Sequence, residues 1–176
     1  VYNIEDEQIE WLTNDQCDKY NPTWSPDGKL NAWIQNTAET AWVKILGENK
    51  AARLIQIDPG FVYWPVFSKD SNSIFFIYEN PCKPPDLWRA SLSDGKLIQL
   101  TNSLPTEFKS SEFIVPEVIS YPSLDDTPIP ALIYKPKTAD TTSPAVVMIH
   151  GGPAFHFGFY WFPLISHLAS RGWTVI

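Results

Sequence analysis

Short alternations of apolar and polar residues, separated by turn residues, characterise the N-terminal half of the chain. This pattern predicts short β-strands joined by tight turns. Asp27-Gly28 and Asp94-Gly95 are strong hairpin signals, because glycine accepts the positive φ that such turns require. The predicted strands are residues 21–25, 30–35, 41–46, 51–57, 63–68, 73–78, 87–92 and 96–101.

Two stretches of this region match each other at a constant spacing. The heptapeptide at 22–28 (PTWSPDG) aligns with 65–71 (PVFSKDS), and the tetrapeptide at 54–57 (LIQI) aligns with 97–100 (LIQL), so both offsets are 43 residues. A period of about 40–45 residues with several short strands per unit is typical of a β-propeller blade. An antiparallel β-sandwich is the alternative, because its strands also recur at regular spacing. The shared offset favours two blades, at about residues 20–58 and 63–102.

The pattern changes after residue 102. Residues 103–112 are polar and turn-rich, so we expect a linker there. Residues 113–121 and 129–135 predict two further strands. The run 145–149 is apolar without alternation, which is typical of a strand buried on both faces.

A helical pattern follows this strand. The apolar positions with helical spacing are Trp161, Leu164, Ile165, Leu168 and Ala169. They predict a helix buried on one face, which Gly172 ends and which leads into a strand over residues 173–176. The order of strand, turn, helix and strand indicates an α/β domain. We therefore expect the C-terminal part of a propeller over residues 1–102 and the first part of an α/β domain over 113–176.

Composition and charge exclude several classes of partner. The chain has 13 Lys and Arg against 20 Asp and Glu, a net charge of −7, and no basic cluster, so neither nucleic acid nor a membrane surface is expected as a partner. Cys17 and Cys82 lie far apart and form no metal-ligand pair, which favours reduced structural thiols over a disulfide. We expect no metal, no organic cofactor and a cytoplasmic location. The first and last residues suggest an internal part of a longer protein.

The sequence His150-Gly151-Gly152-Pro153 is the strongest candidate for chemistry. It directly follows the predicted buried strand, and two glycines let backbone N–H groups approach a ligand closely. Backbone donors fixed in a rigid turn are well suited to stabilise the oxyanion of an acyl-transfer reaction. A glycine-rich strand-to-helix turn with a purely structural role is the alternative.

These features together resemble the prolyl oligopeptidase family of serine peptidases, in the branch of acylaminoacyl and dipeptidyl peptidases. The matching features are Trp24-Ser25-Pro26-Asp27-Gly28, the segment 121–136 with its Asp-Asp-Thr turn, and His150-Gly151-Gly152-Pro153 before a helix that ends in Ser170-Arg171-Gly172. The resemblance implies two partial propeller blades followed by the N-terminal part of an α/β-hydrolase domain.

The resemblance also implies roles for the residues of the turn. Gly152 donates an N–H to the oxyanion, Gly151 permits the turn and His150 braces it. The catalytic Ser, Asp and His lie outside this chain: the family nucleophile stands in a Gly-x-Ser-x-Gly motif, and none of the serines here follows a glycine by two positions. His156 and His167 are not expected to be the catalytic base, which follows the nucleophile in this fold.

Aromatic residues follow the turn directly. Phe155, His156 and Phe157 are candidates to line a substrate pocket. Packing of the hydrolase domain against the propeller explains the same residues equally well, because large aromatics dominate both kinds of surface. A histidine among aromatic residues is also more often a packing residue than a catalytic one.

The expected function is therefore that of a serine peptidase that hydrolyses short peptides through an acyl-enzyme. The expected partners are a short peptide and the remainder of the same polypeptide, and self-association into a homo-oligomer is left open. A propeller that binds a protein or peptide without turnover, or an esterase of the same fold, is the alternative.

Overall fold

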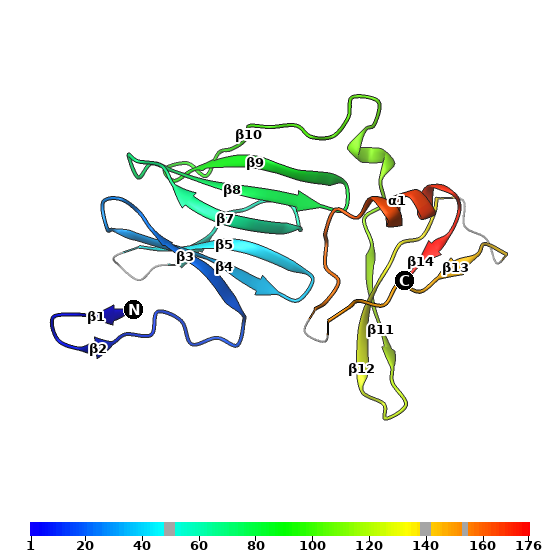
Figure 1. Ribbon diagram of the computed structural model, residues 1–176, viewed down its shortest axis with the longest axis horizontal. Coiled ribbons are helices and arrows are strands. Elements are labelled where there is room, and N and C mark those ends of the chain that lie inside the picture. Colours follow the sequence, from blue (N-terminus) through cyan, green and yellow to red (C-terminus); the bar gives the residue numbers. More distant parts are fainter. Residues whose placement is uncertain (48–51, 138–141, 153–154) are drawn as a thin grey trace.

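Two four-stranded antiparallel sheets dominate the computed structural model, which describes residues 1–47, 52–137, 142–152 and 155–176 (Figure 1). In each sheet the strands lie side by side in chain order. The first sheet contains β3 (Lys19–Trp24), β4 (Leu30–Thr37), β5 (Thr40–Gly47) and β6 (Ala52–Leu54). The second contains β7 (Phe61–Phe67), β8 (Ser73–Asn80), β9 (Lys83–Ser91) and β10 (Leu97–Gln99). The strands predicted for this region are thus confirmed, with shifts at their ends.

The remaining elements are shorter. A hairpin that the sequence pattern did not predict, β1 (Tyr2–Asn3) with β2 (Gln8–Ile9), precedes the first sheet. After the second sheet come a 3-10 turn (Ser110–Glu112), β11 (Glu117–Pro122), β12 (Pro128–Ile133), β13 (Ala145–Val146), α1 (Pro163–Ser170) and β14 (Thr174–Val175). Among the residues described, no helix has the length and apolar character needed to cross a membrane.

The hairpin turns after β3 and β7 carry the same hydrogen bonds. Ser25 Oγ donates to Asp27 Oδ1, and Ser68 Oγ donates to Asp70 Oδ1, both at 2.6 Å. Each serine Oγ also accepts the backbone N–H at the start of the next strand, at 2.9 Å in both turns. A short side chain that bonds its own turn in this way fixes the turn locally. Because positions 25 and 68 are 43 residues apart, the predicted repeat is confirmed for the first two strands of each sheet.

The bulges in β3 and β7 repeat at the same spacing. Asn21 has a φ of 53° and Trp64 a φ of 48°, and each lies at a break in the strand register. A positive φ is uncommon for a residue other than glycine, and a bulge bends the strand and increases its twist. The bulge recurs at equivalent positions, so the two sheets share the same backbone path there. The residues at these positions, asparagine and tryptophan, differ and do not indicate it.

The spacing drifts in the outer strands. Lys44 pairs with Leu54 in the first sheet, and Trp88, which holds the equivalent place in β9, pairs with Gln99. By this pairing Leu54 is equivalent to Gln99 and not to Leu97, so the predicted match of residues 54–57 with 97–100 is wrong in register. One of the two added residues lies in β9 between Lys83 and Asp86, opposite the end of β8, where the strand register is irregular. The second is added between the paired positions of the last two strands.

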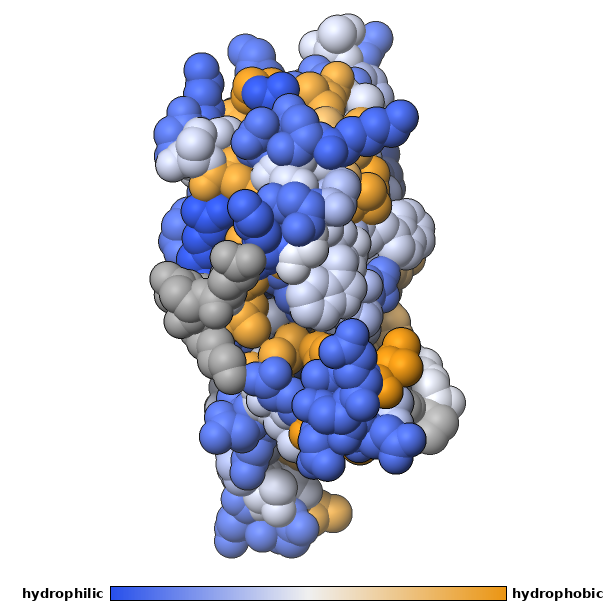
Figure 2. Space-filling view, turned by 90° about the vertical axis from the view of Figure 1, so that its left-hand side faces the viewer, coloured by the Kyte–Doolittle hydropathy of each residue, from blue (hydrophilic) through white to orange (hydrophobic). Residues whose placement is uncertain are grey.

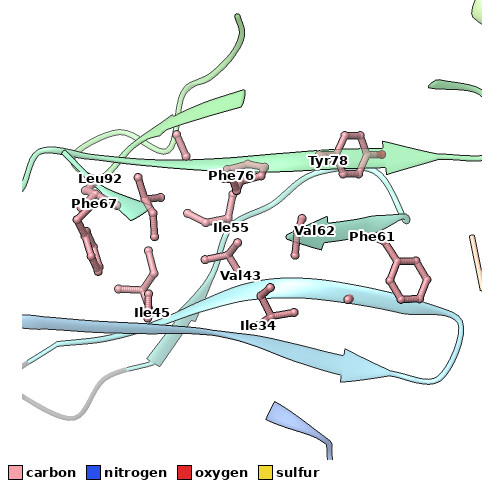
Figure 3. Packing of buried hydrophobic residues seen from close by; sticks show 14 residues of the cluster. Ile34, Val43, Ile45, Ile55, Phe61, Val62, Phe67, Phe76, Tyr78 and Leu92 are labelled. Atoms are coloured by element: carbon pink, nitrogen blue, oxygen red, sulfur yellow. The ribbon is translucent and has the colours of Figure 1, made fainter. Parts of the chain in front are cut away.

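One apolar core joins the two sheets (Figure 3). β7 lies against β3, β4 and β5, so that side chains from both sheets interdigitate. The largest fully buried side chains of this core are Ile34, Val43, Ile45, Phe61, Val62, Ile74, Phe76 and Tyr78. Full burial of one such side chain contributes about 1.5–3 kcal/mol, so this cluster is the main source of stability in the N-terminal half. The surface beyond it, on the side shown in Figure 2, carries mostly hydrophilic residues with scattered apolar ones.

The C-terminal region is built around a parallel strand pair. β14 lies between β13, to which it is parallel, and Tyr134, which follows β12 and exchanges two backbone hydrogen bonds with Val175. The helix α1 connects β13 to β14, so these three elements form a parallel β-α-β unit. Parallel strands joined by a helix are the building unit of α/β sheets, as the sequence predicts for this region.

The predicted buried strand at residues 145–149 is only partly correct. β13 covers Ala145–Val146, and the following residues alternate between the two faces of the sheet. Met148 packs towards α1, whereas Val147 and Ile149 point to the other face and are 66% and 87% exposed. The reason is that α1 covers one face only, so an unbroken apolar run does not by itself bury a strand on both sides.

The predicted helix is present but starts later. It begins at Pro163, which is favourable in the first helical turn, so Trp161 lies outside it. Ile165 and Ala169 are buried as predicted, whereas Leu164 is 52% exposed. A hydrogen bond from its backbone N–H to Glu79 in β8 of the second sheet holds Trp161 instead.

Candidate functional site

The turn formed by His150, Gly151 and Gly152 lies just beyond the carboxyl end of β13. In open α/β sheets, ligands bind outside the carboxyl ends of the strands. Gly152 has a φ of 135°, a conformation that glycine alone adopts readily. All three residues are exposed, and His150 Nδ1 lies 2.9 Å from Gly151 O. Pro153 of the predicted motif lies outside the described residues.

The backbone of the turn is open towards solvent. A Cβ added to Gly151 would meet no atom within 4 Å, so neighbouring atoms do not explain glycine at this position. Among the described residues, none accepts a hydrogen bond from the Gly152 N–H. An exposed N–H in a turn of this kind can donate to an anionic oxygen of a ligand.

The aromatic segment 155–162 packs against the first two sheets. Tyr160 stacks on Phe61 of β7, with ring centroids 3.9 Å apart, and the Phe159 N–H donates to Glu39 O at 2.8 Å. Of the two alternatives that the sequence left open, packing is therefore observed. Burial raises the pKa of Tyr160 to about 12, so its hydroxyl remains protonated at neutral pH.

A buried carboxylate of β8 holds the same segment. Glu79 is 7% exposed, and it accepts hydrogen bonds from the Trp161 N–H at 2.8 Å and from Tyr63 Oη at 2.5 Å. Burial, and then the bond to Glu79, raise the pKa of Tyr63, which keeps the phenol as a donor. The sequence analysis missed both residues. The available signal was a carboxylate directly after the apolar run 74–78 of a predicted strand.

A cavity of about 680 Å³ lies between the aromatic segment, the first sheet and the face of β12. Its lining includes His150, His156, Phe157, Tyr160 and Phe162, with Glu39 on the side of the first sheet. The segment 155–162 thus both packs on the sheets and borders a cavity of the size that ligands occupy.

The three predicted pocket residues differ in their surroundings. His156 and Phe157 line the cavity, whereas Phe155 is 53% exposed and lies with its ring 6.5 Å from that of His150. His156 Nε2 is buried and has no hydrogen-bond partner among the described residues. His167 lies in α1 on the exposed side, away from the cavity.

Cys17 borders the cavity, whereas Cys82 lies outside its lining. Cys17 and Cys82 are both free thiols, as predicted. Within the described residues, no group of three or more His, Cys, Asp and Glu side chains is arranged to hold a metal ion.

We expect Gly158→Ala to loosen the aromatic segment. A Cβ at residue 158 would lie 2.3 Å from the Phe61 ring and 2.9 Å from Glu39 O, so ring or backbone must move. Overpacking of this kind typically costs about 1–3 kcal/mol of unfolding free energy, which thermal unfolding would detect. Gly151→Ala is the matched control, because the added methyl group there enters open space. Equal stability of the two variants would contradict the observed close approach.

No family model matches the chain. Over 157 residues it is 24% identical to the uncharacterized peptidase YuxL of Bacillus subtilis (strain 168), which covers 88% of this chain and 24% of that protein. The fold is similar to that of a puromycin-hydrolyzing peptidase of Mycobacterium tuberculosis, with a TM-score of 0.76, 16% identity, and coverage of 89% of this chain and 24% of the other. It is also similar to dipeptidyl peptidase 4 of Porphyromonas gingivalis, with a TM-score of 0.75, 15% identity, and coverage of 99% and 26%.

These likenesses confirm the predicted resemblance to peptidases of the prolyl oligopeptidase family. The chain has the fold of part of such enzymes. It spans about a quarter of the length of the relatives that it matches.

Proposed function

We propose that this chain is part of a serine peptidase that hydrolyses short peptides through an acyl-enzyme. The observation that carries the proposal is the exposed Gly152 turn at the carboxyl end of β13, which adjoins a cavity of ligand size. The resemblance to known peptidases in fold supports it.

The proposal assigns an architecture to the two regions. Residues 1–102 are the last part of a β-propeller, with blades at about 20–58 and 63–102, and residues 103–112 are the linker. Residues 113–176 begin an α/β-hydrolase domain. The repeated four-stranded sheets, with the same turn bonds 43 residues apart, support the blades. The β13-α1-β14 unit supports the hydrolase domain.

The turn supplies oxyanion stabilisation in this proposal. A serine Oγ from the part of the protein outside this chain attacks the peptide carbonyl carbon, and the carbonyl oxygen becomes an anion. The Gly152 N–H donates to that oxygen, Gly151 permits the turn and His150 braces it through Gly151 O. The C–N bond then breaks, the amine leaves with a proton, and water hydrolyses the remaining ester.

The cavity offers a place for an apolar side chain of the peptide. His156 and Phe157 line it beside His150, whereas Phe155 is exposed and is not part of the lining. Its walls are mainly apolar, and the described lining contains no Lys or Arg. Such a cavity favours an apolar or neutral group next to the scissile bond over an acidic one.

An organophosphorus probe tests the proposal in the whole protein from which this chain comes. We expect the probe to label one serine in a Gly-x-Ser-x-Gly sequence outside residues 1–176, with loss of short-peptide hydrolysis. Residues 1–176 alone should show neither labelling nor turnover, because losing a nucleophile costs several orders of magnitude in rate. Labelling of any serine of residues 1–176 contradicts the assignment. Peptide binding by the whole protein without labelling or turnover favours the non-enzymatic alternative, and hydrolysis of esters alone favours the esterase.

A further inference from the structure

The carboxylate of Glu79 connects two parts of the chain that are far apart in sequence. It lies at the end of β8, where it bonds the hydroxyl of Tyr63 in β7 and the backbone N–H of Trp161 before α1. Through these two bonds the second sheet holds the segment that follows the glycine turn.

A buried carboxylate at this position lowers the stability of the fold relative to an apolar side chain. Burial of an ionisable group disfavours folding unless its oxygens are hydrogen-bonded, and an apolar side chain would fill the same space at lower cost. Both oxygens of Glu79 are bonded, one to Tyr63 and one to Trp161. Residues that cost stability in a strand are expected at sites that serve function.

Ring contacts continue from this anchor to the turn. Tyr160, next to Trp161, stacks on Phe61 at 3.9 Å and lies parallel to the ring of Phe155 at 6.3 Å. The Phe155 ring in turn meets the His150 ring edge-on at 6.5 Å. A series of ring contacts therefore connects the backbone at residue 161 with the turn.

We propose that Glu79 is a positioning residue for the turn 150–152. By accepting the Trp161 N–H, Glu79 fixes the segment 155–162 on the sheets, and the fixed segment sets the direction of the Gly152 N–H. This inference rests on the proposed function, in which that N–H meets the oxyanion. A misplacement of 1 Å at a reacting centre can cost about 10² in rate. A donor that acts as the oxyanion forms affects kcat more than KM.

Two Glu79 variants and a matched control separate this role from ordinary packing in the whole protein. Glu79→Ala removes both acceptors, whereas Glu79→Gln keeps a side-chain oxygen that can accept the Trp161 N–H. Glu112→Gln is the control, because the Glu112 carboxylate also accepts a backbone N–H, from Lys109 at 3.2 Å, but is exposed and lies outside the cavity lining. The measurements are amide hydrogen exchange at Trp161, kcat and KM for a short peptide, and thermal unfolding.

We expect Glu79→Ala to raise exchange at Trp161 at least about tenfold and to lower kcat about tenfold, with KM changed less than about twofold. Glu79→Gln should recover most of both losses, and Glu112→Gln should resemble the wild type. If Glu79→Ala does not fold, Tyr63→Phe removes one donor and should shift both measurements in the same direction by less.

Distinct results overturn the two proposals. Unchanged exchange at Trp161 in Glu79→Ala overturns the anchoring. An unchanged kcat in Glu79→Ala, while a Gly152 variant loses turnover, overturns the positioning role and leaves the proposed function standing. Absence of any peptide hydrolysis by the wild-type whole protein overturns the proposed function, and the exchange measurement still decides whether Glu79 holds the segment.

Discussion

Replacing Gly152 by proline should lower kcat of the whole enzyme by about 10²–10³, with a smaller change in KM. Proline deletes the N–H that we assign to the oxyanion, and that donor acts only as negative charge develops on the oxygen. Proline also fixes φ near −65°, whereas Gly152 has a φ of 135°, so the turn itself must rearrange. Steady-state kinetics on a short peptide would measure the loss.

Gly95→Pro is the matched control for the change in backbone. Gly95 also has a positive φ, of 72°, and its N–H donates to Ser91 O at 3.1 Å in the turn between β9 and β10. The same substitution there deletes a donor and strains a turn outside the site, so stability should fall while kcat is retained. If a folded Gly152→Pro enzyme kept normal kcat, the turn 150–152 would return to a structural role.

Asp86→Ala should lower the free energy of unfolding by about 3 kcal/mol. The carboxylate is 3% exposed, and it accepts hydrogen bonds from Gln99 Nε2 at 3.1 Å, from Thr101 Oγ1 at 2.6 Å and from both the backbone N–H and the hydroxyl of Ser103 at 3.0 Å. Alanine would remove all of these bonds to a charged acceptor, and hydrogen bonds to charged groups contribute more than those between neutral groups. Urea unfolding would measure the change.

The bonds of Asp86 join the end of β10 to the segment that leaves the second sheet. Local opening should therefore start there, and amide exchange over residues 97–103 should rise more than exchange in β8. Asp94→Ala is the control, because Asp94 is exposed and accepts a bond from Lys96 N at 3.1 Å in a surface turn. A loss of stability as small in Asp86→Ala as in this control would contradict the prediction.

The local patterns of the sequence determined the strands and their repeat. Alternation places the strands, Asp-Gly marks the turns at 27–28 and 94–95, and a serine followed two residues later by aspartate makes its turn bonds within a few residues. The groups that interact lie within a few residues of each other, so a short stretch of sequence contains all of them. For the same reason the sequence located the turn 150–152 directly after a strand.

Only the tertiary structure decided the features that depend on distant partners. The irregularity between β8 and β9 accounts for one of the two residues by which the outer strands depart from the predicted register, so that Leu54 matches Gln99 and not Leu97. Val147 and Ile149 are exposed because burial depends on which elements cover a sheet, and α1 covers one face. Glu79 bonds the Trp161 N–H, although the two residues are 82 positions apart in the sequence. A contact between residues so far apart in sequence leaves no periodic signal in either segment. The sequence by itself therefore determined the local elements and the candidate turn, whereas tertiary packing decided which side chains hold the segment that follows the turn.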